Sequence, residues 1–234
     1  MSDWKPKRFW KGSAVVEADG GFTVELDGRR VKTPAKAALI LPTRPMAEAA
    51  AAEWDAQEKE VNPETMPVTR SANAAIDKVS VQHDEVAEML AAYGDSDLLC
   101  YRADSPEALN RRQADQWDPV LDWATTEFGV RLEPRVGVIH APQDSSALQS
   151  LSAAVHALDD FRLAAFHDLV SLSGSLILGF AAARGWRGAD EIWSLSRLDE
   201  KWQEELWGED EEATQQAELK RQAFLHAKRF YDLA

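Results

Sequence analysis

The chain has 234 residues, of which 45% are hydrophobic and 28% charged, a composition typical of a soluble globular protein with one large or two small domains. Its formal net charge of −14 argues against nucleic acid or an anionic membrane surface as the main partner, because both are polyanions. The charge is uneven, since residues 1–36 carry eight Lys and Arg against five Asp and Glu, a net charge of +3. Such a basic segment can steer a partner of mixed charge, or it can be the solvated face of a small sheet.

The cysteine content and the hydropathy of the chain indicate its cellular compartment. Cys100 is the single cysteine, so no intramolecular disulfide can form, which fits a reducing compartment. The first residues, MSDWKPKRFWK, lack the apolar stretch of a signal peptide. The longest uncharged run, Leu169–Ala183, has 15 residues, and a helix needs ~20 to span a bilayer. We therefore expect a cytoplasmic bacterial protein, or a mature form without its presequence.

The first part of the chain predicts a small antiparallel sheet. Between residues 13 and 41, short apolar stretches are separated by Asp-Gly steps, which are strong local signals for hairpins. Phe22, Val24 and Leu26 alternate with polar residues, so one face of this segment is expected to be buried.

From Thr43 onward the pattern is helical. Thr43 is predicted to cap a helix that extends over residues 46–60, and the loop VNPETMP follows. Later helices are expected at 68–78, 81–92, 106–128, 145–160, 161–183, 188–207 and 211–232. The segment DLLCYRA is ambiguous between a strand and a buried turn, and residues 131–142 read as extended.

Several helix ends carry recognisable signals. Gly94 is predicted to end the helix over 81–92 as a left-handed glycine, and Gly129 is predicted to end the helix over 106–128. Ser105 is predicted to cap the start of the helix over 106–128, with Pro106 in its first turn.

The uncharged run predicts a buried central helix. Within one helix over 161–183, the small residues Ser171, Ser175 and Gly179 would form one stripe that lets another helix approach closely. The sequence therefore predicts an α+β protein, with a small N-terminal antiparallel β domain over residues 1–66 and a larger C-terminal α-helical domain over residues 67–234.

The sequence offers no catalytic or metal-binding motif. The five histidines show no recognised ligand spacing, and Cys100 has no cysteine partner. No nucleotide-binding glycine loop or nucleophile elbow occurs, and the segment Gly94–Ser96 lacks the preceding strand that a serine nucleophile would need. We therefore predict no catalytic residues, no metal ligands and no cofactor.

Tryptophan is abundant, with nine residues in the chain: Trp4, Trp10, Trp54, Trp117, Trp123, Trp186, Trp193, Trp202 and Trp207. Most are expected to close the core at its rim, and the Glu53–Asp55 and Trp117–Pro119 segments are expected to be structural. Tryptophan is also enriched among the residues that dominate protein interfaces, so individual side chains can be binding anchors.

One stretch, LDEKWQEELWGEDEEA (198–213), combines both tendencies, because it has eight acidic residues and two tryptophans. Leu195, Leu198, Trp202 and Leu206 have the spacing of a buried helical stripe. Gly208 is predicted to end that helix, with acidic residues at the start of the next one. The helix dipole accounts for some of these acids but does not require four in a row, so the cluster indicates a cationic partner or a solubility function.

The joint order of several stretches resembles one known family, the assembly chaperones of the F-type ATP synthase catalytic head that bind the alpha subunit (assembly factor 2 type). The matching stretches are RFWK (8–11), LDGRRVKTPAKAALILPT (26–43), AAEWDAQ (51–57), RSANAAID (70–77), DLLCYRADSPEAL (97–109), QWDPVLDWA (116–124) and LSRLDEKWQEELWGEDEEA (195–213). None of them is diagnostic alone, but together they span nearly the whole chain.

The resemblance implies a two-domain chaperone without enzymatic activity, located in the mitochondrial matrix in eukaryotic relatives. Such a chaperone holds the free alpha subunit until a beta subunit replaces it, and it prevents aggregation of the exposed alpha surface. On this reading the protein acts as a monomer, does not insert into membranes and does not bind nucleic acid. We expect the partner-binding residues to be those of the acidic stretch, namely Glu205, Trp207, Glu209, Asp210, Glu211 and Glu212.

Two other classes stay open on the sequence alone. One is an enzyme with a site assembled from distant carboxylates or histidines. The other is a small-molecule-binding module, and in either class the site would lie between the two domains.

Overall fold

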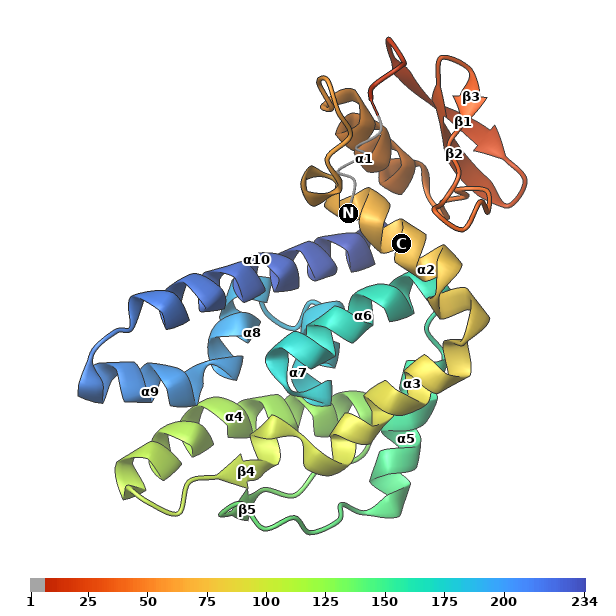
Figure 1. Cartoon of the computed structure of the whole chain (residues 1–234). Coiled ribbons are helices and arrows are strands. Elements are labelled where there is room, and N and C mark those ends of the chain that lie inside the picture. Colours follow the sequence, from red (N-terminus) through yellow and green to blue (C-terminus); the bar gives the residue numbers. More distant parts are fainter. Residues whose placement is uncertain (1–6) are drawn as a thin grey trace. The chain divides into compact units, whose positions relative to one another are not determined.

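The computed structural model describes residues 7–234, which form an α+β fold with a small antiparallel sheet followed by helices, as predicted (Figure 1). Trp4 lies outside the described residues. The chain divides into two compact units. Unit 1 runs to His83 and also includes Asp160–Ala164 and Arg229–Ala234, while unit 2 comprises Asp84–Asp159 and Ala165–Lys228. Unit 1 thus extends past residue 66 and takes in two later segments.

The sheet of unit 1 consists of β1 (Ser13–Ala18), β2 (Gly21–Leu26) and β3 (Arg29–Arg30), in that order and antiparallel. Gly20 and Gly28 have φ values of 87° and 79°, which the tight turns between the strands require. The predicted hairpins are therefore confirmed. Helix α1 (Arg44–Asp55) packs on β1 and β2 and covers one face of the sheet (Figure 1).

Helix α1 begins where the sequence predicts, because the Thr43 side chain accepts a hydrogen bond from the Met46 amide. It ends at Asp55, so the predicted extension to residue 60 is wrong. The buried Gln57 side chain explains the early end. Its Nε2 donates to the Glu53 carbonyl at 3.0 Å, and its Oε1 accepts from the Asn62 amide at 2.7 Å, which turns the chain back.

The Glu53–Asp55 segment joins the elements of unit 1. The Glu53 carboxylate accepts hydrogen bonds from the amides of Val68 and Thr69 at 2.7 and 2.8 Å, at the start of α2 (Pro67–Asp77). A carboxylate at this position also interacts favourably with the helix dipole. The Asp55 carboxylate accepts from the Ser13 amide at 3.0 Å and so ties α1 to β1.

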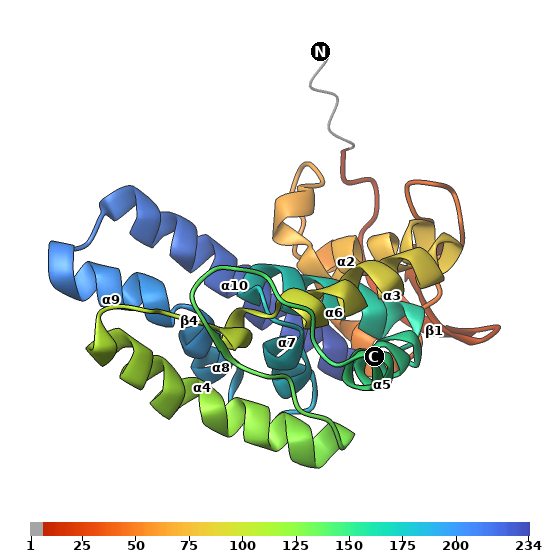
Figure 2. The same cartoon turned by 90° about the horizontal axis from the view of Figure 1, so that it is seen from below.

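The remaining chain is almost entirely helical (Figures 1 and 2). Its α-helices are α3 (His83–Ala91), α4 (Glu107–Phe128), α5 (Ser145–His156), α6 (Asp160–Ser173), α7 (Leu176–Ala183), α8 (Ala189–Ser196), α9 (Leu198–Trp207) and α10 (Glu211–Leu233). Short 3₁₀ helices occupy Pro63–Thr65, Val79–Val81, Ala92–Ser96 and Leu98–Cys100. The strands β4 (Tyr101–Arg102) and β5 (Arg135–Val136) pair in parallel. No helix of the described part is long and apolar enough to cross a membrane.

Two long helices predicted from the sequence are each interrupted. The segment 161–183 breaks at Gly174, whose φ is 71°, and the segment 188–207 breaks at Arg197. The predicted stripe of small residues is therefore wrong. Ser171 is exposed on α6, whereas Ser175 caps α7 by accepting a hydrogen bond from the Leu178 amide at 2.9 Å.

Two predicted caps are also wrong. Gly94 is buried inside the 3₁₀ helix that extends α3 and does not end a helix in the left-handed conformation. Pro106, not Ser105, occupies the position before α4, and no side chain caps that helix. The other end of α4 is as predicted, since Gly129 follows Phe128 with a φ of 70°.

Helix α7 is the centre of unit 2, because all eight of its residues are buried. Its N-terminus is held by the fully buried carboxylate of Asp97, which accepts hydrogen bonds from the Ser175 hydroxyl at 2.7 Å and the Ile177 amide at 3.0 Å. The same carboxylate accepts from the Leu99 amide at 3.0 Å. The predicted buried central helix is thus confirmed in a shorter form.

Trp117 has the structural position that the sequence predicts. Its ring is fully buried, and its Nε1 donates to the Leu195 carbonyl at 2.9 Å, which joins α4 to α8. Trp54 is half-buried and packs edge to face against Trp10, with 5.3 Å between ring centroids.

Replacing Trp54 with alanine is expected to destabilise the protein by about 2 kcal/mol or more, because the ring contact with Trp10 and its buried area are lost. Thermal unfolding followed by circular dichroism would measure the change. Trp207→Ala is the matched control, since that side chain is 79% exposed and should leave the melting temperature nearly unchanged. A native melting temperature for soluble Trp54→Ala would contradict the prediction.

Asp97→Asn is expected to lower the free energy of unfolding at neutral pH by about 1–3 kcal/mol, because its amide group would turn a donor towards buried donors. Urea unfolding would measure the difference. Asp115→Asn, an exposed change on α4, serves as the control. Equal stability of the Asp97 and Asp115 variants would refute the structural role of the carboxylate.

The Asp97 carboxylate also predicts a pH dependence of stability. Burial raises its pKa from 3.8 to about 6, against the effect of the hydrogen bonds that it accepts. Below pH 3.8 the group is protonated in both the folded and the unfolded state. Between pH 3.8 and about 6 the unfolded state ionises while the folded state stays protonated, so the stability of the wild type should fall as the pH rises through this window, although the ionised carboxylate still accepts its hydrogen bonds above it. The stability difference between wild type and Asp97→Asn, measured across this window, should decrease with pH, and an increase would contradict the assignment.

Candidate interaction surface at the turn between α9 and α10

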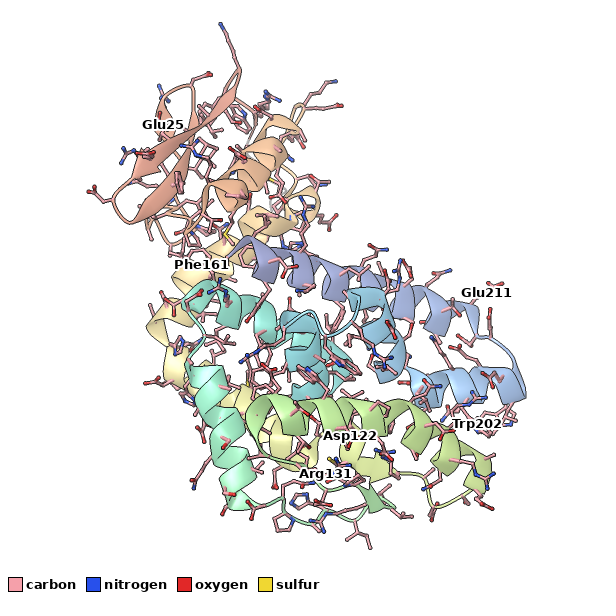
Figure 3. All side chains as sticks on the ribbon, turned by 180° about the vertical axis from the view of Figure 1, so that it is seen from behind. Glu25, Asp122, Arg131, Phe161, Trp202 and Glu211 are labelled. Carbon is pink, nitrogen blue, oxygen red and sulfur yellow. The ribbon has the colours of Figure 1, made fainter. Side chains whose placement is uncertain are left out.

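The predicted binding residues lie at the turn that joins α9 to α10, within unit 2. Helix α9 ends at Trp207, Gly208 turns the chain with a φ of 89°, and α10 begins at Glu211. We call residues Glu205–Glu212 the acidic corner. Figure 3 shows Glu211 at the start of α10 and Trp202 on α9.

The apolar side chains of the acidic corner face solvent. Trp207 is 79% exposed and Leu206 is 57% exposed. The predicted burial of Leu206 is therefore wrong, because the helix breaks at Arg197 and the spacing counted from Leu195 does not continue through α9. Trp202 is half-buried rather than part of the core. The exposed Trp207 and Leu206 side chains make this turn a candidate for apolar contact with a partner.

Helix α9 is held in place by side chains of α4. The Arg112 guanidinium donates to the Glu205 carboxylate at 2.8 Å and lies 4.6 Å from the centre of the Trp202 ring. This hydrogen bond lowers the pKa of Glu205. Nearer the start of α9, the Asp199 carboxylate accepts a hydrogen bond from the Gln113 Nε2 at 2.7 Å. The base of the acidic corner is thus fixed before any partner binds.

The acidic residues of the corner fall into two groups. Glu205 is paired with Arg112, and Asp210 caps α10 by accepting a hydrogen bond from the Ala213 amide at 2.8 Å. Glu209, Glu211 and Glu212 are exposed and have no hydrogen-bond or ion-pair partner among residues 7–234. The N-terminus of α10 favours negative charge there, but their carboxylates remain open to a partner.

The arginines of unit 2 are already engaged. The unit holds 26 acidic residues against 12 Lys and Arg, so it carries a net charge of −14. Eight of its nine arginines form ion pairs with carboxylates, namely Arg102, Arg111, Arg112, Arg131, Arg184, Arg187, Arg197 and Arg221. The ninth, Arg135, donates to the Pro142 carbonyl at 2.8 Å. The arginines of unit 2 are therefore not available to the open carboxylates of the acidic corner.

The first turns of α10 extend this surface. Residues 211–216 are exposed, and Leu219 further along is 64% exposed. Glu218 pairs with Arg221 at 2.8 Å, and this bond, with a second one from Gln222, lowers the pKa of Glu218 to about 2. The acidic corner therefore continues into a helix face that the chain itself does not cover.

The six predicted residues thus lie at one turn of the structure, but they have two different roles. Trp207, Glu209, Glu211 and Glu212 are open to a partner, whereas Glu205 and Asp210 hold the turn. The sequence did not reveal that Leu206 is exposed or that Arg112 holds α9 in place. Arg112 lies 93 residues before its partner Glu205, so no local pattern could have revealed the pair.

The described residues contain no group of three His, Cys, Asp or Glu side chains that could hold a metal ion. Cys100 is buried, and burial raises the pKa of its thiol, so the thiol is not a reactive group. His167 donates to Asp168 at 2.9 Å, and this bond raises the pKa of the histidine. Both features are explained by local structure.

Comparison with known proteins identifies the family to which the chain is similar. A family model described as ATP12 chaperone protein matches residues 7–125. The chain is 50% identical to Atp12 from Paracoccus denitrificans, whose crystal structure it matches with a TM-score of 0.96 over 99% of each chain. It is 43% identical to Atu1473 from Agrobacterium tumefaciens, a putative chaperone, with a TM-score of 0.92 over 97% of this chain and 86% of that one.

A more distant relative is the mitochondrial protein atp12 of Schizosaccharomyces pombe, which is 28% identical over 222 residues, or 88% of this chain and 75% of the relative. The family model covers just over half of the present sequence, and the structural matches cover almost all of it. The resemblance to the ATP synthase assembly chaperones is therefore confirmed, and the chain belongs to the ATP12 chaperone family.

Proposed function

We propose that this protein binds the free alpha subunit of the F-type ATP synthase catalytic head, prevents its aggregation and hands it over for assembly with the beta subunit. It does so without catalysing a reaction and without a cofactor. Membership of the ATP12 chaperone family supports the general role. The observation that carries the proposal is the acidic corner, where exposed Trp207 lies among open carboxylates.

The acidic corner has the composition of a protein-binding site. Interfaces commonly place an aromatic anchor at the centre of a charged rim, and tryptophan is among the residues whose loss costs most binding energy. Trp207 and Leu206 supply the apolar contact, while Glu209, Glu211 and Glu212 supply acceptors for arginine or lysine side chains. Arginine–carboxylate pairs are directional, so they would fix the register of the partner.

This arrangement also suits a complex that must later dissociate. Exposed charge pairs speed association and select the partner, but each contributes little to the affinity, about 0–1 kcal/mol. An apolar anchor of one or two side chains is likewise smaller than the core of a permanent interface. A beta subunit that offers a larger apolar surface to the alpha subunit would displace such a chaperone.

The two alternatives that the sequence left open, an enzyme and a small-molecule-binding module, are not favoured by any specific observation in the described residues. The open carboxylates of the corner belong to exposed residues, where water would reach any reacting group. We further propose a cytoplasmic location in a bacterium and the mitochondrial matrix for eukaryotic relatives, of which one is described as mitochondrial.

Reversing the open charges by the triple substitution Glu209→Lys, Glu211→Lys and Glu212→Lys is expected to weaken binding of the purified alpha subunit by about tenfold or more. Isothermal titration calorimetry would measure the affinity, and circular dichroism would show that the fold is unchanged. The matched control is Glu48→Lys, Glu64→Lys and Asp115→Lys, which changes the net charge equally at exposed positions elsewhere. Equal affinities of the two triple variants would show that the acidic corner is not the binding site for the alpha subunit.

Trp207→Ala is expected to weaken binding of the alpha subunit by about tenfold or more, because an exposed aromatic anchor is lost while the fold is kept. The same calorimetric titration measures this effect. Affinity equal to that of the wild type, in a variant with the native melting temperature, would remove Trp207 from the interface. A pull-down with tagged wild-type protein should recover the alpha subunit without beta.

A further inference from the structure

A second candidate surface lies far from the acidic corner in sequence. A groove of about 520 Å³ is lined by residues of α3, the 3₁₀ helix Ala92–Ser96 and α5, and all of these residues belong to unit 2. Its lining includes Glu88, Ala91, Ala92, Asp95, Leu148 and Ala153. We call this the α3–α5 groove.

The floor of the α3–α5 groove is made of small side chains. Buried Gly94 allows α5 to approach, because a Cβ atom there would lie only 3.2 Å from a methyl carbon of Leu148 and 3.3 Å from one of Leu176. Ala92 and Ala153 line the groove and are exposed, and Leu148 is only partly buried. Small residues between two helices leave room for the backbone of a third helix to approach closely.

The α3–α5 groove is acidic on one side. Glu88 is exposed and has no ion-pair or hydrogen-bond partner among the described residues. Asp95 is partly satisfied, since it accepts from the Gln143 amide at 2.7 Å and lies 3.3 Å from the His140 Nε2 atom. The other side holds Gln149 and His156, and the His156 ring bonds the Ser152 carbonyl at 2.9 Å. The arginines of unit 2 are engaged elsewhere, so the exposed Glu88 carboxylate is open to a lysine or arginine of a partner.

The segments that contribute Glu88 and bind Asp95 also carry exposed apolar side chains. Met89 on α3 follows Glu88 and is 48% exposed. Asp95 also holds the base of the loop 133–143, whose tip presents Val138 and Ile139 at 91% and 86% exposure. The ends of this loop are joined by a hydrogen bond from the Glu133 amide to the Gln143 side chain at 2.8 Å. The loop is thus ordered by polar contacts, while its apolar tip stays uncovered.

We infer that the α3–α5 groove binds a cationic amphipathic helix of the client subunit, with a small apolar face against the alanines and a lysine or arginine beside Glu88. That the helix belongs to the alpha subunit rests on the proposed function. That it is cationic and amphipathic is inferred from the side chains that line the groove. A helix fits because the site already consists of two helices, and it would complete a third position against them. The acidic corner and the groove then give the chaperone two separate contacts, which raises avidity without a strong single site.

The test uses the full-length ¹⁵N-labelled chain and a synthetic amphipathic peptide of about 15 residues composed of Leu, Ala and Lys, a length at which helices become marginally stable. NMR titration should shift the amide signals of α3, the 3₁₀ helix Ala92–Ser96 and α5. A peptide with Glu in place of Lys is the probe control and should not bind. Shifts confined to the acidic corner, or equal binding of both peptides, would overturn the inference.

Two pairs of matched variants sharpen the result. Glu88→Lys should weaken binding of the Lys peptide about fivefold or more, whereas Asp115→Lys, an equal charge change on α4, should weaken it less than twofold. Ala153→Arg should fill the groove and abolish binding, while Ser150→Arg, exposed on the same helix and outside the groove lining, should not. Equal losses within either pair would overturn the inference. These outcomes are independent of the corner variants, so failure of the groove and failure of the proposed function are distinguishable.

Discussion

The buried carboxylate of Asp97 is the interaction on which the helical unit depends. It accepts hydrogen bonds at the N-terminus of α7, the helix whose residues are all buried, and it also holds the 3₁₀ helix that precedes β4. A helix end buried in a core needs partners for its free amides, because water cannot supply them there. Asp97 and Ser175 provide these partners from two segments that are 78 residues apart. Helices α4, α6 and α8 pack against a central helix that is fixed in this way.

With the core held by one buried acid, the remaining charge of unit 2 is arranged on its surface. Most of the arginines form ion pairs, some within one helix and others between segments far apart in the chain, such as Arg112 with Glu205 and Arg184 with Glu127. Some of the carboxylates without a cationic partner lie at the acidic corner, and Glu88 lies in the α3–α5 groove. Each of these places also has exposed apolar side chains. A protein that binds a cationic, aggregation-prone client needs both features together, since charge alone gives no desolvated contact and apolar surface alone gives no selectivity.

The stability of the unit and its binding surfaces are therefore separable. Trp54 and Trp117 lie within the packed units, while Trp207 is exposed, although all three occur in similar acidic sequence surroundings. Tryptophan thus contributes to packing at positions 54 and 117, whereas at position 207 its side chain is exposed to solvent. The difference arises from what each ring meets in the fold, such as the Leu195 carbonyl at Trp117 Nε1.

The sequence by itself determined those features that depend on near neighbours. The hairpins, the Thr43 cap, and the helix ends at Gly129 and Gly208 were all predicted, because turns and caps are decided within a few residues. The family could also be recognised, since it depends on the order of short stretches. Only the tertiary structure decided the helix breaks at Gly174 and Arg197, the exposure of Leu206, and the pairing of Glu205 with Arg112. The physical reason is that these features follow from contacts between segments far apart in the chain, where burial and distant hydrogen bonds outweigh local helical periodicity.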